Sequence, residues 1–173
     1  MTNLNPDEEK IIERMIKDKA FRVAMVRKSH YWFFHYYFGR HYVKYRTADF
    51  QREIFQLTEN KDIQNIVVTA FRGSAKSTII TMSYVIWSIV GEQQKKFALI
   101  LGKTQVKAQN LWMHIKKELE QNDELRRDLG PFEVEGNQWG AHSLTLRDYG
   151  ARISIGSVEQ SVRGIRHNQH RPD

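Results

Sequence analysis

The apolar positions near the N-terminus recur with the period of a helix. Asn5 is a suitable N-cap, Pro6 fits the first helical position, and the acidic residues that follow favour the positive end of the helix dipole. The sequence therefore predicts a helix over residues 6–18, with an apolar face formed by Ile11, Ile12, Met15 and Ile16.

From residue 47 onward, apolar runs alternate with amphipathic stretches. A short helix is predicted over residues 48–57, with Phe50, Ile54 and Phe55 facing inward. Two apolar runs are predicted as buried strands, and each precedes a helix: 66–70 before 76–90, and 97–102 before 104–121. Strands that alternate with helices indicate a parallel sheet with right-handed crossovers.

The pattern changes to strict alternation in "SLTLRDYGARISIG", on both sides of Asp148-Tyr149-Gly150. This alternation predicts an antiparallel hairpin near the C-terminus. We therefore predict an α/β fold with a mostly parallel sheet flanked by helices. A helical, aromatic-rich segment over residues 1–46 precedes the sheet-bearing domain, which occupies residues 47–173.

Residues 30–46, "HYWFFHYYFGRHYVKYR", combine aromatic rings with basic side chains. This combination occurs in surfaces on which single-stranded nucleic acid stacks, but crowded aromatics at helical spacing more often fill a core. We favour packing of an N-terminal helix against the next domain. His30, His35 and His41 are predicted to be interfacial residues and not metal ligands, because no carboxylate cluster accompanies them.

Composition narrows the class of protein. The 173 residues suit one ordinary domain, and a net charge of +7 favours a polyanionic partner. No apolar run approaches the roughly 20 residues of a membrane span, and the N-terminus lacks the pattern of a secretion signal. The absence of cysteine excludes disulfides and thiolate metal sites, so we expect a cytosolic protein.

The stretch "IVVTAFRGSAKSTIITM", residues 66–82, has the outline of a phosphate-binding loop. In the pattern G-x-x-x-x-G-K-[ST], the two glycines fall here at Ala70 and Ala75. Gly73 can still supply a positive φ, and each alanine adds only a methyl group. The alternative is an ordinary strand, turn and helix with an exposed lysine. We favour the phosphate-binding loop.

Three further segments accompany this loop: "DFQREIF", "FALILGKTQVKAQNLW" and "GSVEQSVRGIRHNQHRPD". In this order and spacing, residues 48–173 resemble the N-terminal ATPase part of the large terminase subunit, the DNA-packaging motor of tailed bacteriophages. Loops of that family often lack the two glycines and often carry an arginine where Arg72 stands. The resemblance implies a P-loop NTPase-type sheet.

The resemblance also implies ATP and Mg²⁺ as ligands and assigns roles to individual residues. Lys76 would hold the β- and γ-phosphates, and Ser77 would coordinate Mg²⁺ with Thr78 beside it. Arg72 would add charge near the γ-phosphate. Backbone N–H groups would bind phosphate oxygens along the turn, from Gly73, Ser74, Ala75, Lys76 and Ser77.

Two more roles follow from the resemblance. Gln51 matches the glutamine that similar motors place against adenine, and a solvent-facing helix glutamine is an equal alternative. Arg163, in "VRGIR", matches the arginine that a neighbouring subunit presents to the transition state, with Arg166 as the second candidate. The alternative for Arg163 is a surface charge that flanks the hairpin.

Members of this family continue past "RPD" into an apolar strand that ends in an acidic pair, which orients Mg²⁺ and activates water. The sequence reaches only Asp173, which no apolar run precedes, so we assign it no metal role and expect the chain to hydrolyse little ATP alone. His167 and His170 are predicted to belong to a basic loop and not to a metal site.

Three function classes remain open. The leading one is a motor ATPase that moves double-stranded DNA into a capsid in the cytoplasm of a bacterial host. The resemblance then implies an oligomeric ring, a small terminase subunit and a portal as partners. The second class is a helicase-like translocase, and the third is a non-enzymatic basic nucleic-acid-binding module with a structural loop. Arg72 and "VRGIR" favour the first class.

Overall fold

The computed structural model describes residues 5–132, 139–159 and 165–172. These residues form a mixed α/β protein with two compact units, Met1–Trp87 and Ser88–Asp173. The division that the sequence predicts after residue 46 falls inside the first unit. In the described part of the chain, no helix is both long and apolar enough to cross a lipid bilayer.

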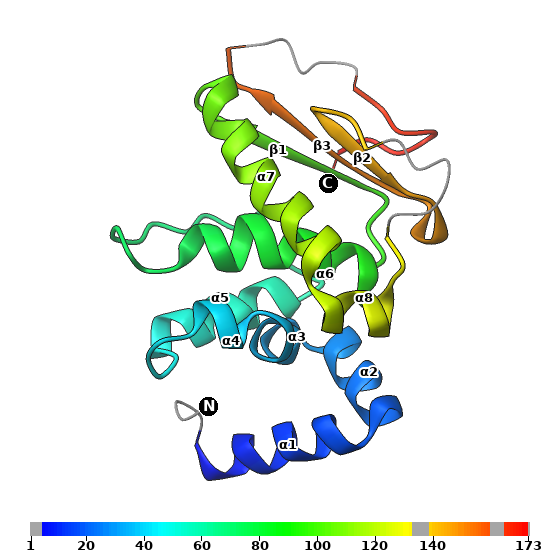
Figure 1. Ribbon diagram of the computed structural model, residues 1–173. Helices are drawn as coiled ribbons and strands as arrows, with labels where there is room; N and C mark the ends of the chain where they lie inside the picture. The colour runs from blue at the N-terminus through cyan, green and yellow to red at the C-terminus, as the bar shows by residue number, and fades with distance from the viewer. Residues whose placement is uncertain (1–4, 133–138, 160–164, 173) are drawn as a thin grey trace. The chain divides into compact units, whose positions relative to one another are not determined.

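The described part of the first unit is built from helices (Figure 1). They are α1 (Pro6–Lys17), α2 (Lys19–Lys28), α3 (His30–Tyr37), α4 (Gly39–Tyr42), α5 (Asp49–Glu59) and the π-helical η1 (Ser77–Tyr84), which continues into α6 (Val85–Val90). Helix α1 begins as predicted. The side chain of Asn5 accepts from the Glu8 amide at 2.9 Å, and Glu8 Oε2 accepts from the Asn5 amide at 2.9 Å.

The aromatic segment fills the core of the first unit, which confirms the packing interpretation. Helix α3 contacts both α5 and η1. Tyr31 meets Phe55 of α5 edge to face, Phe33 meets Tyr37 in the same way, and Phe34 packs against Phe55 in a tilted arrangement. His30 and His35 are buried among these rings, whereas His41 is exposed. The buried aromatic side chains of this segment are Phe33, Phe34, Tyr37 and Phe38.

The second unit contains a small mixed sheet in the order β1-β3-β2. Strands β1 (Phe97–Gly102) and β3 (Ala151–Ser157) are parallel, whereas β2 (Ser143–Leu146) is antiparallel to β3. The strand predicted over 97–102 and the C-terminal hairpin are therefore confirmed. The 3₁₀ turn η2 (Arg147–Tyr149) closes the hairpin. A mostly parallel sheet was predicted. Among the described residues, the β1–β3 pair is parallel and the β2–β3 pair is antiparallel, so the sheet is mixed.

Helix α7 (Gln105–Gln121) packs against β1 and β3, as the predicted strand–helix succession requires. The hydroxyl of Thr104 caps it by accepting from the Lys107 amide. Gly102 lets the helix approach the strand, because a Cβ built there would lie 2.7 Å from the Ala108 nitrogen. The buried face of the helix consists of Ala108, Trp112, Ile115, Glu118 and Leu119.

A further helix, α8 (Asp123–Leu129), was not predicted. Its signals are present in the sequence. Asn122 caps it by accepting from the Leu125 amide, and Asp123 and Glu124 occupy its first turn. Leu125 and Leu129 are its buried residues. The helix is too short for the spacing of its apolar residues to repeat often enough to be recognised.

The prediction of a buried strand over residues 66–70 is wrong. This segment has no regular structure, Val67 is 91% exposed, and Ile66 is 36% exposed. A strand needs a neighbour for its backbone N–H and C=O groups, and the described regular elements of this unit are helices. The apolar run was sufficient to suggest a strand, but no partner within the unit's described residues pairs with it.

Candidate functional site

The turn over residues 71–75 joins this irregular segment to helix η1, as the sequence predicts. It contains two residues with a positive φ, Gly73 at 89° and Ala75 at 63°. Ala75 occupies the position of the second glycine of the phosphate-loop pattern. A non-glycine residue in this region costs about 1–3 kcal/mol and persists only where its surroundings enforce it. The backbone thus adopts the conformation that glycine would favour, despite the alanine.

The residues that follow the turn gather polar groups at the start of η1. Lys76 is the N-cap residue of this helix, and its Nζ donates to the Ala70 carbonyl at 3.3 Å. The Lys76 side chain therefore bridges the two ends of the turn. Ser77 is exposed and Thr78 is half-buried. The first amides of a helix lack intrahelical partners, so an ammonium, two hydroxyls and free amides come together here.

Arg72 and Phe71 lie on the outer part of the turn. Arg72 is exposed, so its guanidinium is accessible to a ligand. Phe71 is 68% exposed and meets the ring of Phe50 edge to face, with 5.6 Å between the centroids. Phe50 is half-buried, so the predicted inward orientation of α5 holds fully for Ile54 and Phe55 and only partly for this ring.

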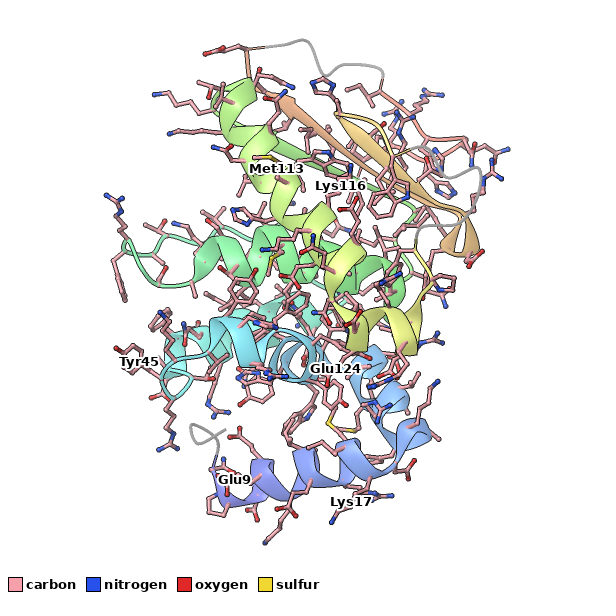
Figure 2. All side chains as sticks on the ribbon, in the orientation of Figure 1. Glu9, Lys17, Tyr45, Met113, Lys116 and Glu124 are labelled. Carbon is pink, nitrogen blue, oxygen red and sulfur yellow. The ribbon has the colours of Figure 1, made fainter. Side chains whose placement is uncertain are left out.

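A cavity of about 230 Å³ lies beside the turn, within the first unit. The turn contributes Gly73 and Ala75, and helix α5 contributes Gln51. The segment 42–47 forms another wall, on which Tyr45 is 83% exposed and points outward (Figure 2). All but Thr47 of this wall belongs to the aromatic and basic segment 30–46, but the sequence did not indicate that these residues border the turn, because they come from the end of α4 and the irregular stretch that follows.

Gln51 connects helix α5 to the turn. Its Oε1 accepts from the Ala48 amide at 3.0 Å, and its Nε2 donates to the Ser74 carbonyl at 3.1 Å. Ser74 is buried and Gln51 is half-buried, so the bond is partly shielded from water. An amide side chain has two N–H donors and an oxygen with two lone pairs. Gln51 therefore keeps a donor and a lone pair for a ligand, and its predicted contact with adenine stays a prediction.

Arg163 lies outside the described residues, so its role stays a prediction. Arg166 is described and exposed, in the second unit. His167 and His170 exchange backbone hydrogen bonds of 3.0 and 2.9 Å and so form a tight turn. Burial lowers the pKa of His167, and the nearby charges of Arg152 and His170 lower it further. Among the described residues, no group of three or more His, Asp or Glu side chains could hold a metal ion.

A cluster of polar side chains, most of them buried, lies beside the cavity and was not predicted. Glu8 and Arg52 form an ion pair with 2.7 Å between Oε1 and Nη1. His35 lies next to the cavity wall and is bonded to Thr47 at 2.7 Å. Burial lowers the pKa of His35 to about 4, although its hydrogen bond to the Tyr31 carbonyl raises it. Glu8 and Arg52 are 44 positions apart, and no local pattern could pair them.

Comparison of the chain with models of known protein families found no match. Comparisons with curated proteins and with solved structures also found no match. The resemblance to terminase subunits therefore stays a prediction, and the geometry of the turn and cavity is the independent ground for a function.

Proposed function

We propose that the turn over residues 71–77 and the adjoining cavity bind ATP with Mg²⁺. The observation that carries this proposal is the left-handed conformation of Ala75, directly before a lysine that begins a helix. Backbone strain of this kind is concentrated at ligand-binding turns. Gln94 and Asn168 also have a positive φ, so the conformation of Ala75 points to a phosphate because Lys76 and a helix start follow it directly.

The chemistry of the turn suits a triphosphate. The N-terminal amides of η1 and the positive end of its dipole favour an anion. The Lys76 ammonium uses one of its three donors on Ala70 and keeps two for phosphate oxygens. Arg72 adds a second cation, which is exposed, whereas Lys76 is half-buried. Amides, ammonium and guanidinium together form the donor set that phosphate groups require.

A base would enter the cavity next to the turn. Gln51 lines this cavity and is bonded to the turn through Ser74, so one side chain borders the proposed base site and supports the proposed phosphate site. Its remaining donor and lone pair match the paired donor and acceptor of an adenine edge. This arrangement supports ATP as the ligand.

Mg²⁺ would arrive with the nucleotide. This ion keeps several waters and binds substrate phosphates with few protein ligands. The Ser77 hydroxyl, exposed at the helix start, fits as one such ligand. When bound, the ion would neutralise charge on the phosphates. The side chains of Lys76 and Ser77 would hold and orient the phosphate end of the nucleotide.

We infer further, from the resemblance, that the fold is of the P-loop NTPase type and that the chain is the ATPase part of a terminase large subunit. Its partners would be double-stranded DNA, a small terminase subunit, a portal and other copies in a ring. Arg163, or Arg166 in its place, would reach the nucleotide of a neighbouring subunit. The motor would work in the cytoplasm of the bacterial host.

The decisive experiment is a titration of thermal stability with Mg²⁺-ATP for the wild type, Lys76→Ala and Lys28→Ala. Lys28 is an exposed lysine at the end of α2 and serves as the matched control. At an ATP concentration of a hundred times Kd, binding stabilises the folded state by about 2.7 kcal/mol. We expect the wild type and Lys28→Ala to respond and Lys76→Ala to respond little.

An equal response of Lys76→Ala would remove the turn as the phosphate site. If none of the three proteins responds, the turn is structural. A salt-dependent affinity for DNA that ATP leaves unchanged would then favour the basic nucleic-acid-binding module.

A further inference from the structure

A buried carboxylate in helix α1 accepts hydrogen bonds from two other helices of the first unit and from the N-cap of its own helix. Glu8 is 7% exposed. Its Oε1 accepts from Arg52 Nη1 of α5 at 2.7 Å and from the Tyr31 hydroxyl of α3 at 2.7 Å. Its Oε2 accepts from the Asn5 amide at 2.9 Å. The carboxylate thus connects α1 to the two helices that border the cavity.

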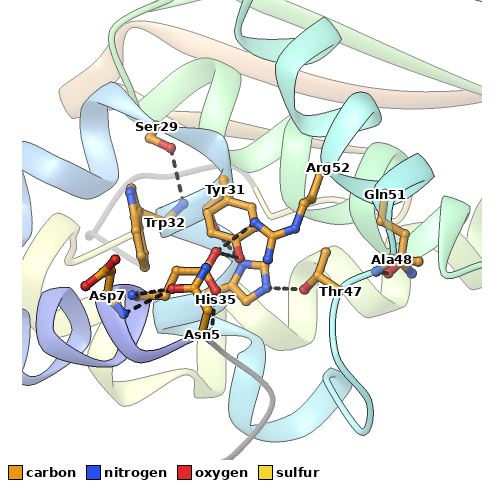
Figure 3. Close-up of polar contacts among 11 residues, drawn as sticks. Asn5, Asp7, Ser29, Tyr31, Trp32, His35, Thr47, Ala48, Gln51 and Arg52 are labelled. Carbon is orange, nitrogen blue, oxygen red and sulfur yellow. Dashed lines mark hydrogen bonds and ion pairs between the residues drawn. The ribbon is translucent and has the colours of Figure 1, made fainter.

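Two routes lead from Glu8 to the cavity wall. The first is direct, because Arg52 follows Gln51 on α5. The second runs through α3, where the ring of Tyr31 packs against His35 with 4.0 Å between centroids. His35 Nδ1 donates to the Tyr31 carbonyl at 2.8 Å, so its Nε2 accepts from the Thr47 hydroxyl at 2.7 Å. Figure 3 shows Tyr31, His35, Thr47 and Arg52 lying together.

Both routes end on residues that line the cavity, Gln51 and Thr47. Glu8, Tyr31, His35 and Arg52 are not among the residues that line the cavity, so they act on its wall only through Gln51 and Thr47. Binding sites lose affinity when their walls move by about 0.5 Å, so the groups behind the wall matter as much as those that touch the ligand.

Removing one member of the Glu8–Arg52 pair is expected to destabilise the other. Arg52 Nη2 is buried and has no hydrogen-bond partner among the described residues. Its charge therefore depends on Glu8, and the hydrogen bond to Glu8 raises the pKa of Arg52. Without the carboxylate, the buried Nη2 end of the guanidinium would lose the charge that compensates it. An ion pair with a buried carboxylate and a half-buried guanidinium contributes little to stability by itself, which favours a role in positioning.

We propose that α1 is a positioning element of the cavity and that Glu8, through Arg52 and Tyr31, sets the affinity for nucleotide. This inference rests on the proposed nucleotide binding. Coupling between two sites is reciprocal, so bound nucleotide must also hold α1 more firmly against the rest of the unit. Docking of α1 and binding of nucleotide are then linked in one equilibrium.

The test measures nucleotide affinity by calorimetry at a temperature where every variant is folded. The set is the wild type, Glu8→Gln, Arg52→Gln, the double variant Glu8→Gln/Arg52→Gln and the control Glu9→Gln. Glu9 is exposed on the outer side of α1 (Figure 2). We expect each single variant of the pair to bind on the order of ten-fold more weakly and the double variant to be no weaker than the worse single one. The control should stay within about two-fold.

A second readout separates positioning from general stability. Amide hydrogen exchange in α1 is compared with and without saturating Mg²⁺-ATP. The wild type should show slower exchange in α1 with nucleotide, and Glu8→Gln should lose this response. A merely structural role of Glu8 would speed exchange in α1 equally with and without nucleotide.

If Glu8→Gln does not fold, Tyr31→Phe replaces it, because that change removes only the hydroxyl that donates to Glu8. Wild-type affinity in a folded Glu8→Gln or Tyr31→Phe protein, with Lys76-dependent binding intact, would overturn the inference and leave the proposed function standing. Absence of Lys76-dependent binding in the wild type would overturn both.

Discussion

The two units of this protein bury different kinds of side chain. The first unit, Met1–Trp87, encloses His30, His35 and the Glu8 carboxylate. The second unit, Ser88–Asp173, encloses mainly apolar side chains where α7 meets the sheet, with Glu118 of α7 also buried. Both units have an apolar core, but among the described residues the buried histidines lie in the first unit. Stability in the first unit should therefore depend more strongly on protonation.

The buried histidines of the first unit must be neutral. Thr58 Oγ1 donates to the Phe55 carbonyl, so it accepts from His30 Nδ1 at 2.7 Å. His30 Nε2 then accepts from the Ser83 hydroxyl at 3.0 Å. Burial lowers the pKa of His30 to about 3, with a smaller contribution from His35. A proton on either ring would leave a charge in the core and require the hydroxyl of Ser83 or Thr47 to turn and accept instead of donate.

The largest expected effect is a loss of stability of the first unit in acid. The folded pKa values, about 3 for His30 and about 4 for His35, lie below the value of 6.5 expected when unfolded. Between these values the unfolded state binds more protons, so stability is full above about pH 6.5 and falls as the pH drops. Two groups at roughly 1.4 kcal/mol per pH unit each give a loss of roughly 5 kcal/mol by pH 4.5.

Amide hydrogen exchange, corrected for its intrinsic pH dependence, can follow α3 and α7 separately. We expect protection of α3 to fall much more than protection of α7 between pH 7 and pH 4.5. His35→Gln should flatten the pH dependence of α3. A common slope in both helices would contradict the comparison between the two units.

Next in size is a packing defect in the second unit. Ile115 of α7 is fully buried, and replacing it by alanine removes apolar contacts and leaves a cavity. We expect Ile115→Ala to lower the free energy of unfolding by about 2–5 kcal/mol. Denaturant titration at pH 7 and pH 5 should give the same loss. Met113→Ala is the control, because Met113 lies on the same helix and is 59% exposed (Figure 2).

The helix caps should behave alike in both units. Asn5 caps α1 and Asn122 caps α8, each by accepting from a backbone amide at the start of its helix. We expect Asn5→Ala and Asn122→Ala each to cost about 1 kcal/mol, measured by thermal unfolding. A much larger loss for Asn5→Ala would show that the cap also supports the Glu8 carboxylate, whose Oε2 accepts from the Asn5 amide.

A smaller effect of opposite sign is expected at the turn. Ala75→Gly relieves the left-handed strain but makes the unfolded chain more flexible, so we expect a net gain of about 0.5–1 kcal/mol. Ala24→Gly, in the middle of α2, should instead lose about 0.5–1 kcal/mol. Equal losses at both positions would mean that Ala75 is not strained.

The smallest effect is expected in the irregular segment before the turn. Because Val67 is 91% exposed, Val67→Thr should change stability by less than about 0.5 kcal/mol. The matched change Ile100→Thr, in the buried strand β1, should cost clearly more. A loss above about 1 kcal/mol at Val67 would restore the prediction of a buried strand.

Local signals in the sequence were sufficient for elements whose stabilising contacts lie within a few residues. The cap at Asn5, the cap at Thr104 and the hairpin closed at Gly150 depend on neighbours along the chain, so their residue types could be recognised directly. The order of turn, lysine and helix over residues 71–77 was likewise visible, because it too is contiguous.

Tertiary structure decided whatever depends on a distant partner. The apolar runs 66–70 and 97–102 look alike in the sequence, but within the described part of the chain only the second pairs with a strand. The left-handed backbone of Ala75 is held by its surroundings and not by its residue type. Glu8 meets Arg52 only because α1 and α5 are both folded. Pairing, strain and buried charge are properties of three-dimensional contacts, and the spacing of residues along a chain does not contain them.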